Sequence, residues 1–211
     1  MPGIVIIDYD MGNVGSIRNM FKKIGHDVTI SAKSEDILNA TGLILPGVGA
    51  FDTGMASLAA RNIIPLLKKR ALDDHIPVLG ICLGMQLLTD SSEEGSLPGL
   101  GLVPGKTIKF NFTSTENKSL RIPHMGWNTT TVQKKNRLFT GLEAESRFYF
   151  VHSYHVVCAN QEDILTTTPY GFEFCSSLQK NNIYGVQFHP EKSHKFGMQL
   201  LSNFFSITQS L

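Results

Sequence analysis

One cysteine stands in a pattern that suits a nucleophile. Cys82 lies between Gly80 and Gly84, at a point where a buried strand pattern runs straight into a helix pattern. Such a tight turn leaves no room for side chains at the flanking positions and presents the central residue above the sheet. The helix dipole favours the thiolate there, and the amide of Leu83 is free to donate to an oxyanion. The alternative is a buried cysteine in a glycine-rich turn, and a base is needed to decide between them.

A base and an acid are predicted at a second strand end. Of the seven histidines, only His189 directly follows a predicted buried parallel strand, and ligand sites lie at the carboxyl ends of such strands. Glu191 comes two residues later, so in an extended chain its carboxylate points the same way and can stabilise the imidazolium. Pro190 keeps His189 out of the α region and is expected to hold the pair extended. A lone histidine in a turn is usually structural, but with the elbow a Cys82–His189–Glu191 triad is the better explanation.

A further oxyanion donor is predicted in the segment 45–49, Leu-Pro-Gly-Val-Gly, at another strand end. The glycines on either side of Val48 permit a backbone conformation in which its amide turns toward the nucleophile, beside that of Leu83. The alternative is an ordinary Pro-Gly turn. No cofactor is expected, because no phosphate-binding glycine motif follows a strand. No metal is expected either, since His124, His152 and His155 lack carboxylate or cysteine companions at ligand spacing.

A parallel sheet is needed to bring these strand ends together, and the first half of the chain carries its signature. Short β-branched runs alternate with helical patterns, which is typical of an open α/β sheet with helices on both faces. Strands are expected at 3–7, 27–30, 42–45 and 77–81. Helices are expected from Val14 to Gly25, from Ser34, and over 51–73 with an interruption near 62–65, where Pro65 disfavours a continuous helix.

The second half has a different pattern. Threonine-rich alternating runs at 129–132, 148–151 and 164–167 predict antiparallel strands. One more buried strand is expected at 183–188, and an amphipathic helix at 196–205. The sequence contains no repeat, low-complexity tract or linker, so residues 1–211 are expected to form a single domain.

Composition excludes several classes of protein. The 211 residues are 42% apolar and 18% charged with a net charge of +1, which fits neither a disordered chain nor a nucleic-acid-binding one. No apolar run is long enough to cross a membrane, and the N-terminus lacks the basic region of a signal peptide. The three cysteines are widely spaced and form no zinc or disulfide pattern. We therefore expect a cytoplasmic protein with partners other than nucleic acid or membrane.

These motifs resemble the class I (triad) glutamine amidotransferases, which have a flavodoxin-like fold, and more closely the HisH family of glutaminase subunits of imidazole glycerol phosphate synthase. The Pro-His-Met-Gly-Trp-Asn run at 123–128 is characteristic of HisH. The resemblance spans nearly the whole chain, in the family's order, and rests on the blocks 45–49, 79–88, 92–95, 123–128, 148–154 and 185–193.

The resemblance implies a reaction and its contacts. Cys82 would attack the carboxamide of L-glutamine, His189 would transfer the proton to ammonia, and water would release glutamate from the γ-glutamyl thioester. A polar residue on an apolar helix is the alternative for one predicted contact, Gln86. His152 and His155 are expected to be strand residues rather than catalytic ones. The predicted glutamine contacts are Gly49, Gln86, Glu94, Ser153 and Tyr154.

A partner subunit is also expected. Only twenty residues follow Glu191, too few for a domain that binds an ammonia acceptor. In the HisH family the partner in the heterodimer is HisF, a (β/α)8-barrel cyclase of histidine biosynthesis that receives ammonia through an internal channel. Lys192 and Trp127 are the candidate interface residues. A solvated surface lysine and a core tryptophan are the respective alternatives.

Three competing functions remain open at this point. The first is a HisH paralogue that feeds ammonia to another synthase, such as a sugar amidotransferase of surface polysaccharide synthesis. The sequence of residues 192–198 resembles that of such paralogues. The second is a triad hydrolase that acts on γ-glutamyl compounds without a partner. The third is a catalytically idle binding module on the same fold, against which the intact Cys82, His189 and Glu191 argue.

Overall fold

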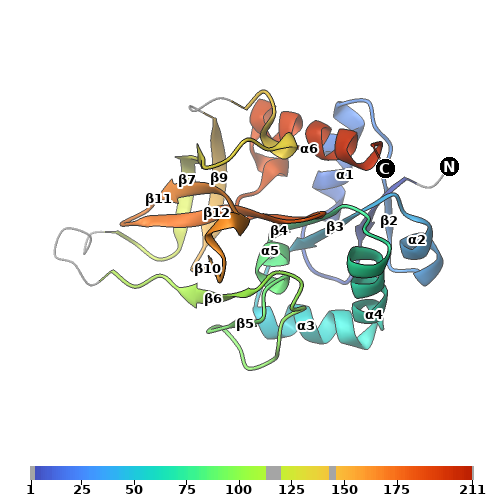
Figure 1. The fold of residues 1–211 in the computed structure, drawn as a ribbon, viewed down its shortest axis with the longest axis horizontal. Helices are drawn as coiled ribbons and strands as arrows, with labels where there is room; N and C mark the ends of the chain where they lie inside the picture. The colour runs from blue at the N-terminus through green and yellow to red at the C-terminus, as the bar shows by residue number, and fades with distance from the viewer. Residues whose placement is uncertain (1–2, 113–119, 143–145, 211) are drawn as a thin grey trace.

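The computed structural model describes residues 3–112, 120–142 and 146–210. A twisted central sheet runs through the molecule, with helices on both of its faces (Figure 1). Five neighbouring strands form its parallel half, as predicted. In spatial order they are β2 (Thr29–Ser31), β1 (Ile4–Ile7), β3 (Gly42–Gly47), β4 (Val78–Cys82) and β13 (Ile183–Val186).

Two apolar cores lie on opposite faces of this sheet. Alternate residues of β1 divide between them, with Ile4 and Ile6 in one core and Val5 and Ile7 in the other. Burial on both faces explains why these strands are continuous apolar runs. The helices α1 (Val14–Lys23) and α6 (His194–Thr208) cover one face, and α2 (Ser34–Asn39), α3 (Phe51–Ala60), α4 (Ile63–Lys68) and α5 (Leu83–Leu87) cover the other (Figure 1).

The predicted antiparallel character of the second half is confirmed. The strand β12 (Glu173–Lys180) pairs antiparallel with β13, β10 (Tyr154–Cys158) and β11 (Ile164–Pro169). A separate two-stranded ladder joins β7 (His124–Thr129) to β9 (Arg147–His152). The remaining elements are β5 (Ser91–Ser92), β6 (Gly105–Lys109), β8 (Thr131–Val132), the π-helical turn η1 (Lys69–Asp73) and the 3-10 turns η3 (Arg137–Phe139), η4 (Gln161–Asp163) and η5 (Pro190–Lys192).

The predicted interruption of the helix near 62–65 is confirmed, but Pro65 is not the residue at the break. The break lies at Asn62, which adopts a left-handed conformation with φ of 54° between α3 and α4. Pro65 instead sits in the first turn of α4. A proline is tolerated there because the first N–H groups of a helix have no partner within it.

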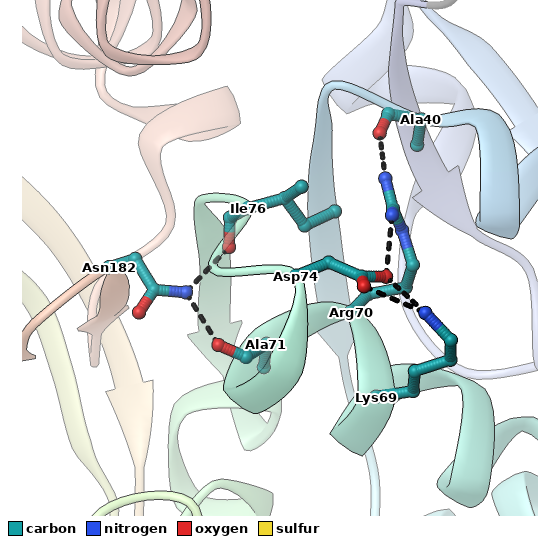
Figure 2. A network of polar contacts seen from close by, with 7 residues as sticks. All are labelled: Ala40, Lys69, Arg70, Ala71, Asp74, Ile76 and Asn182. Atoms are coloured by element: carbon teal, nitrogen blue, oxygen red, sulfur yellow. Dashed lines mark hydrogen bonds and ion pairs between the residues drawn. The ribbon is translucent and has the colours of Figure 1, made fainter. Parts of the chain in front are cut away.

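A network of polar contacts ties together the ends of three parallel strands that lie opposite the predicted site (Figure 2). The side-chain amide of Asn182, just before β13, donates to the carbonyls of Ala71 and Ile76 at 2.8 and 2.7 Å. Ile76 lies just ahead of β4. These bonds fix the start of β13 relative to the start of β4.

The same network reaches β3. Asp74 accepts hydrogen bonds from Lys69 and Arg70, and the Arg70 guanidinium also donates to the carbonyl of Ala40, which lies just before β3 (Figure 2). The hydrogen bonds of the two cations hold the pKa of Asp74 below its usual value. Three strands whose carboxyl ends carry the site are thus anchored at their amino ends.

Candidate active site

The structure confirms the sharp turn at Cys82. The cysteine is the last residue of β4, directly before α5, with φ of 53° and ψ of −111°, a conformation that side-chain-bearing residues rarely adopt. The neighbouring glycines are required by space. A Cβ atom on Gly84 would lie 1.8 Å from the carbonyl oxygen of Leu45, and one on Gly80 would lie 2.7 Å from the carbonyl oxygen of Gly84.

The sheet brings His189 to this turn. The strand β13 runs parallel to β4, with Val186 opposite Ile81, so the residues after β13 emerge beside Cys82. The Nδ1 atom of His189 lies 2.8 Å from Oε1 of Glu191, and both side chains are 2% exposed. The Cys82 side chain is also near enough to the His189 ring to raise the pKa of the imidazole.

The expected extended conformation of the pair is wrong. His189 itself is extended, with φ of −102° and ψ of 96°, as its position before proline requires. At Pro190, however, the chain enters the 3-10 turn η5, because the fixed φ of proline also suits the first position of a helical turn. The contact between His189 and Glu191 is therefore made across this turn.

The backbone of His189 is held from both sides. Its N–H donates to the carbonyl of Tyr149 at 2.9 Å, and its carbonyl accepts from the hydroxyl of Ser193 at 2.6 Å. The same hydroxyl accepts from the N–H of Tyr149 at 3.0 Å. These bonds fix the backbone of the histidine to β9.

The surroundings of His189 favour its protonated, charged form. Burial alone lowers the pKa of His189, but hydrogen bonds with Cys82 and Glu191 and the negative charges of both raise it to about 10. The imidazole is therefore protonated at neutral pH and faces the sulfur of Cys82.

A cavity of 270 Å³ opens in front of Cys82 and His189. It brings together all the predicted oxyanion and glutamine-contact residues. A larger surface cavity of 640 Å³ around η3 contains none of them. The smaller cavity is lined by Val48, Gly49, Cys82, Leu83, Gln86, Glu94, Pro123, Val151, His152, Ser153, Tyr154, His189 and Lys192.

Two of the predicted contacts also hold the fold together. Oε2 of Glu94 accepts from the N–H of Phe51 at 2.9 Å, at the start of α3. The side-chain amide of Gln86 donates to the carbonyl of Tyr154 at 3.1 Å. By contrast, the segment carrying the predicted oxyanion donor is open, since Val48 is 53% exposed and Gly49 adopts φ of 119°.

Sequence reasoning missed two residues at this site. Gln187 is fully buried, and its Nε2 lies 3.8 Å from Sγ of Cys82. Its position two residues before His189 could have revealed it, because alternate residues of a strand share a face. His152 was expected to be only a strand residue, yet it ends β9 and lines the cavity.

The two predicted interface residues lie in different places. Lys192 lines the cavity, with its Nζ 5.5 Å from the centre of the Tyr149 ring. Trp127 lies outside it on β7 and is 46% exposed, so the core-packing alternative is wrong. Its indole stacks on the His194 ring, with centroids 5.3 Å apart and an angle of 3° between the planes.

The remaining candidate groups are accounted for by packing. His155 lies among aromatic rings, 4.7 Å from the centre of Phe110. Cys158 and Cys175 are buried with their sulfur atoms 3.8 Å apart. Within the described ranges, no three His, Cys, Asp or Glu residues are grouped so as to hold a metal ion. The helices of the same ranges include none with the length and apolar character of a membrane span.

Solved structures share this fold. A crystal structure of a glutamine amidotransferase superimposes with a TM-score of 0.74 at 17% identity, covering 97% of this chain and 98% of that one. The structure of PurLQS from Thermotoga maritima gives a TM-score of 0.71 at 19% identity, with 97% and 98% coverage. The predicted fold class, an open and mainly parallel α/β sheet with added antiparallel strands, is thereby confirmed.

Sequence comparison identifies the family. Residues 5–208 match the family Glutamine amidotransferase class-I. The chain is 56% identical to imidazole glycerol phosphate synthase subunit HisH 2 of Methanococcus maripaludis, covering 95% of this chain and 98% of the relative. It is 46% identical to subunit HisH of Bdellovibrio bacteriovorus, with 97% and 100% coverage. The corresponding HisH 2 subunit of Pseudomonas aeruginosa is 44% identical, with 97% and 99% coverage. The chain therefore belongs to the HisH family of class-I glutamine amidotransferases.

Proposed function

We propose that this protein is the glutaminase subunit of an imidazole glycerol phosphate synthase. It hydrolyses L-glutamine to L-glutamate and ammonia and passes the ammonia to a HisF-type (β/α)8 cyclase subunit for histidine biosynthesis. The observation that carries the proposal is the buried Cys82–His189–Glu191 arrangement at the wall of a 270 Å³ cavity. The 56% identity to a HisH subunit supports the same assignment.

Acylation follows from the charges in the site. The Cys82 thiolate attacks the carboxamide carbon of glutamine and forms a tetrahedral intermediate with a negatively charged oxygen. The His189 imidazolium donates its proton to the amide nitrogen, which departs as ammonia and leaves a γ-glutamyl thioester. Glu191 keeps the ring oriented and stabilises its charge through the 2.8 Å contact.

Deacylation reverses these roles. Neutral His189 takes a proton from water, which attacks the thioester carbonyl and releases glutamate, and the thiolate–imidazolium pair is restored. The backbone amides of Leu83 and Val48 are proposed to donate to the oxyanion in both steps. One such donor is worth about 3 kcal/mol of transition-state stabilisation.

The Val48 donor is a suitable point of control by the partner. Val48 lies on an exposed turn beside Gly49, where the positive φ permits rotation of the peptide plane. We propose that the isolated subunit has low activity and that an acceptor-loaded cyclase shifts this turn to the conformation that donates. Glutamine hydrolysis by the isolated chain that stays unchanged when cyclase and its ligand are added would contradict this mechanism.

The assignment is tested by reconstitution with a HisF cyclase from the same genome. Co-purification should yield a heterodimer that makes imidazole glycerol phosphate from its nucleotide substrate with either glutamine or ammonium as nitrogen source. Cys82→Ala should abolish the glutamine-dependent reaction and leave the ammonium-dependent reaction intact. Loss of both reactions, or of neither, would contradict the assignment.

A second candidate acceptor is favoured by one observation. The relatives from Methanococcus maripaludis and Pseudomonas aeruginosa are both numbered as HisH 2. A number of this kind indicates a second HisH copy, and such a copy is free to serve another synthase, for example a sugar amidotransferase. Growth of a histidine auxotroph that lacks its own glutaminase subunit, on low ammonium, separates the two. Rescue by this chain supports histidine biosynthesis, and failure of an expressed and folded chain supports the other acceptor.

A further inference from the structure

A single backbone carbonyl fixes the orientation of two buried side-chain amides. The oxygen of Tyr154 can only accept hydrogen bonds, so the Gln86 atom 3.1 Å from it must be the nitrogen Nε2. That nitrogen has a second hydrogen, which points to Gln187 at 3.1 Å, so the facing atom of Gln187 must be its oxygen. The nitrogen of Gln187 is then left to face Sγ of Cys82 at 3.8 Å.

The carbonyl at the head of this chain is itself held in place. Nδ1 of His152 lies 2.7 Å from the Tyr154 oxygen and must be the donor. Nε2 of the same ring accepts from Nδ1 of His124 at 3.0 Å. Burial lowers the pKa of His152 to about 3, so the ring is neutral and keeps this single tautomer at neutral pH. The orientation of the amides is therefore fixed by the pair of buried histidines.

We propose that Gln187 is a further catalytic residue, whose side-chain N–H donates to the sulfur of Cys82 and stabilises it as a thiolate. A donor at this point favours the thiolate over the thiol, because the ionised sulfur is much the better acceptor. Gln187 is fully buried, so water does not compete for the bond. Gln86 acts as its positioning residue in addition to its predicted contact with glutamine. The proposal rests on Cys82 being the nucleophile of the proposed function.

Alkylation of Cys82 by iodoacetamide tests the proposal without any glutamine. Gln187→Met keeps a similar volume and removes the donor, whereas Gln187→Glu keeps the oxygen facing Gln86 and puts a carboxylate oxygen at the sulfur. The rate constant at pH 7, measured by mass spectrometry of the Cys82 peptide, should fall about 10- to 100-fold in the Met variant, equivalent to one hydrogen bond to a charged group. It should fall further in the Glu variant.

A packing role predicts a different order. If Gln187 only fills space, the folded Met variant reacts within twofold of the parent, and that result overturns the proposal. Gln161→Glu, at an exposed position, is the matched control and should react like the parent. Thermal unfolding of each variant shows that the comparison is made on folded protein. If the Met variant does not fold, a folded Glu variant that reacts within twofold of the parent also overturns it.

Glutaminase kinetics in the reconstituted heterodimer provide the second readout. Because Gln187 contacts the sulfur and not the cavity, Gln187→Met should lower kcat at least tenfold while KM for glutamine changes less than threefold. A parent heterodimer that hydrolyses no glutamine would overturn the proposed function. An active parent whose Met variant is equally active would overturn only the role of Gln187.

Discussion

Tyr9 donates its phenolic hydroxyl to the carbonyl oxygen of Pro46, two residues before the predicted oxyanion donor Val48. Burial raises the pKa of Tyr9, and the nearby Cys82 raises it further, so the hydroxyl stays protonated and keeps donating. The tyrosine thus anchors the amino end of the segment that we propose to move on partner binding.

Tyr9→Phe should therefore loosen that segment. It leaves the buried Pro46 carbonyl without its donor, and we expect the free energy of unfolding to fall by about 1–3 kcal/mol. The kcat for glutamine should fall more than KM changes. Tyr170→Phe is the matched control, because it removes a hydrogen bond to another backbone carbonyl, that of Arg121, outside the cavity. Urea unfolding and steady-state kinetics check both variants, and equal kcat values in the two would refute the anchoring role.

Two glycines that differ in their surroundings test the elbow. Gly84→Ala places a Cβ 1.8 Å from the Leu45 oxygen, and the resulting shift of backbone should destabilise the protein by about 3 kcal/mol or more. Gly15, the second residue of α1, has no atom from outside its own helix turn within 4 Å of its Cβ position. Gly15→Ala should stabilise the protein by about 0.5–1 kcal/mol through the higher helix propensity of alanine. Urea unfolding measures both, and a neutral Gly84→Ala would be incompatible with the described turn.

Glu191→Gln tests the acid of the proposed triad. The neutral amide removes a charge that raises the pKa of His189, so less imidazolium is present and the ring is less firmly oriented. We expect kcat to fall by up to about 10⁴-fold, as in a serine-protease triad, with KM nearly unchanged. The exposed Glu173→Gln should leave both constants unchanged. A Glu191→Gln enzyme with more than half of the parental kcat would show that Glu191 plays no part in the triad.

The same ion pair predicts how stability responds to alkaline pH. The pKa of His189 is raised in the folded state, from 6.5 to about 10. A group of this kind contributes stability that is complete below pH 6.5 and is lost as pH rises through the folded value. The free energy of unfolding should therefore decline between pH 7 and 10, and the decline should be smaller in Glu191→Gln. Urea titrations across this range supply the measurement, and an identical decline in the two proteins would contradict it.

Buried neutral histidines predict the opposite trend in acid. Burial lowers the pKa of His124 to about 4 and that of His152 to about 3. Their unfolded forms take up protons from pH 6.5 downward, so the folded state loses stability as pH falls from 6.5 toward 4. Each contributes a slope that approaches about 1.4 kcal/mol per pH unit. His124→Gln should reduce the slope by that amount between pH 6 and 4.5, and an unchanged slope would show that His124 is protonated in the folded protein.

The sequence was sufficient for the parallel half of the fold because local signals coincide there. Strands such as β1 and β3 are buried on both faces, so their apolar runs are unmistakable. The elbow at Cys82 follows from the same residues. Because neighbouring parallel strands end at the same edge of a sheet, the strand ends alone were enough to predict that Cys82 and His189 lie close together.

Elements stabilised by distant polar contacts could not be predicted in this way. The interior of β12 contains Ser176 and Ser177, which are fully buried because Thr166 of β11 bonds to both hydroxyls at 2.8 and 2.7 Å. Serines in a sequence indicate loops unless such partners are known. The spacing of Gln187 and His189 could have placed Gln187 at the site, but its orientation depends on Gln86, about a hundred positions earlier in the chain.

The exposed position of Trp127 on β7 gives the molecule an optical probe of its own. It is the only tryptophan in the sequence, so all of the tryptophan fluorescence of the chain comes from this one side chain. The indole is half in solvent and stacked on the His194 ring, so its emission is sensitive to the loss of water around it. A subunit that covers β7 would shift the emission to shorter wavelength, and assembly could be followed in real time without any label.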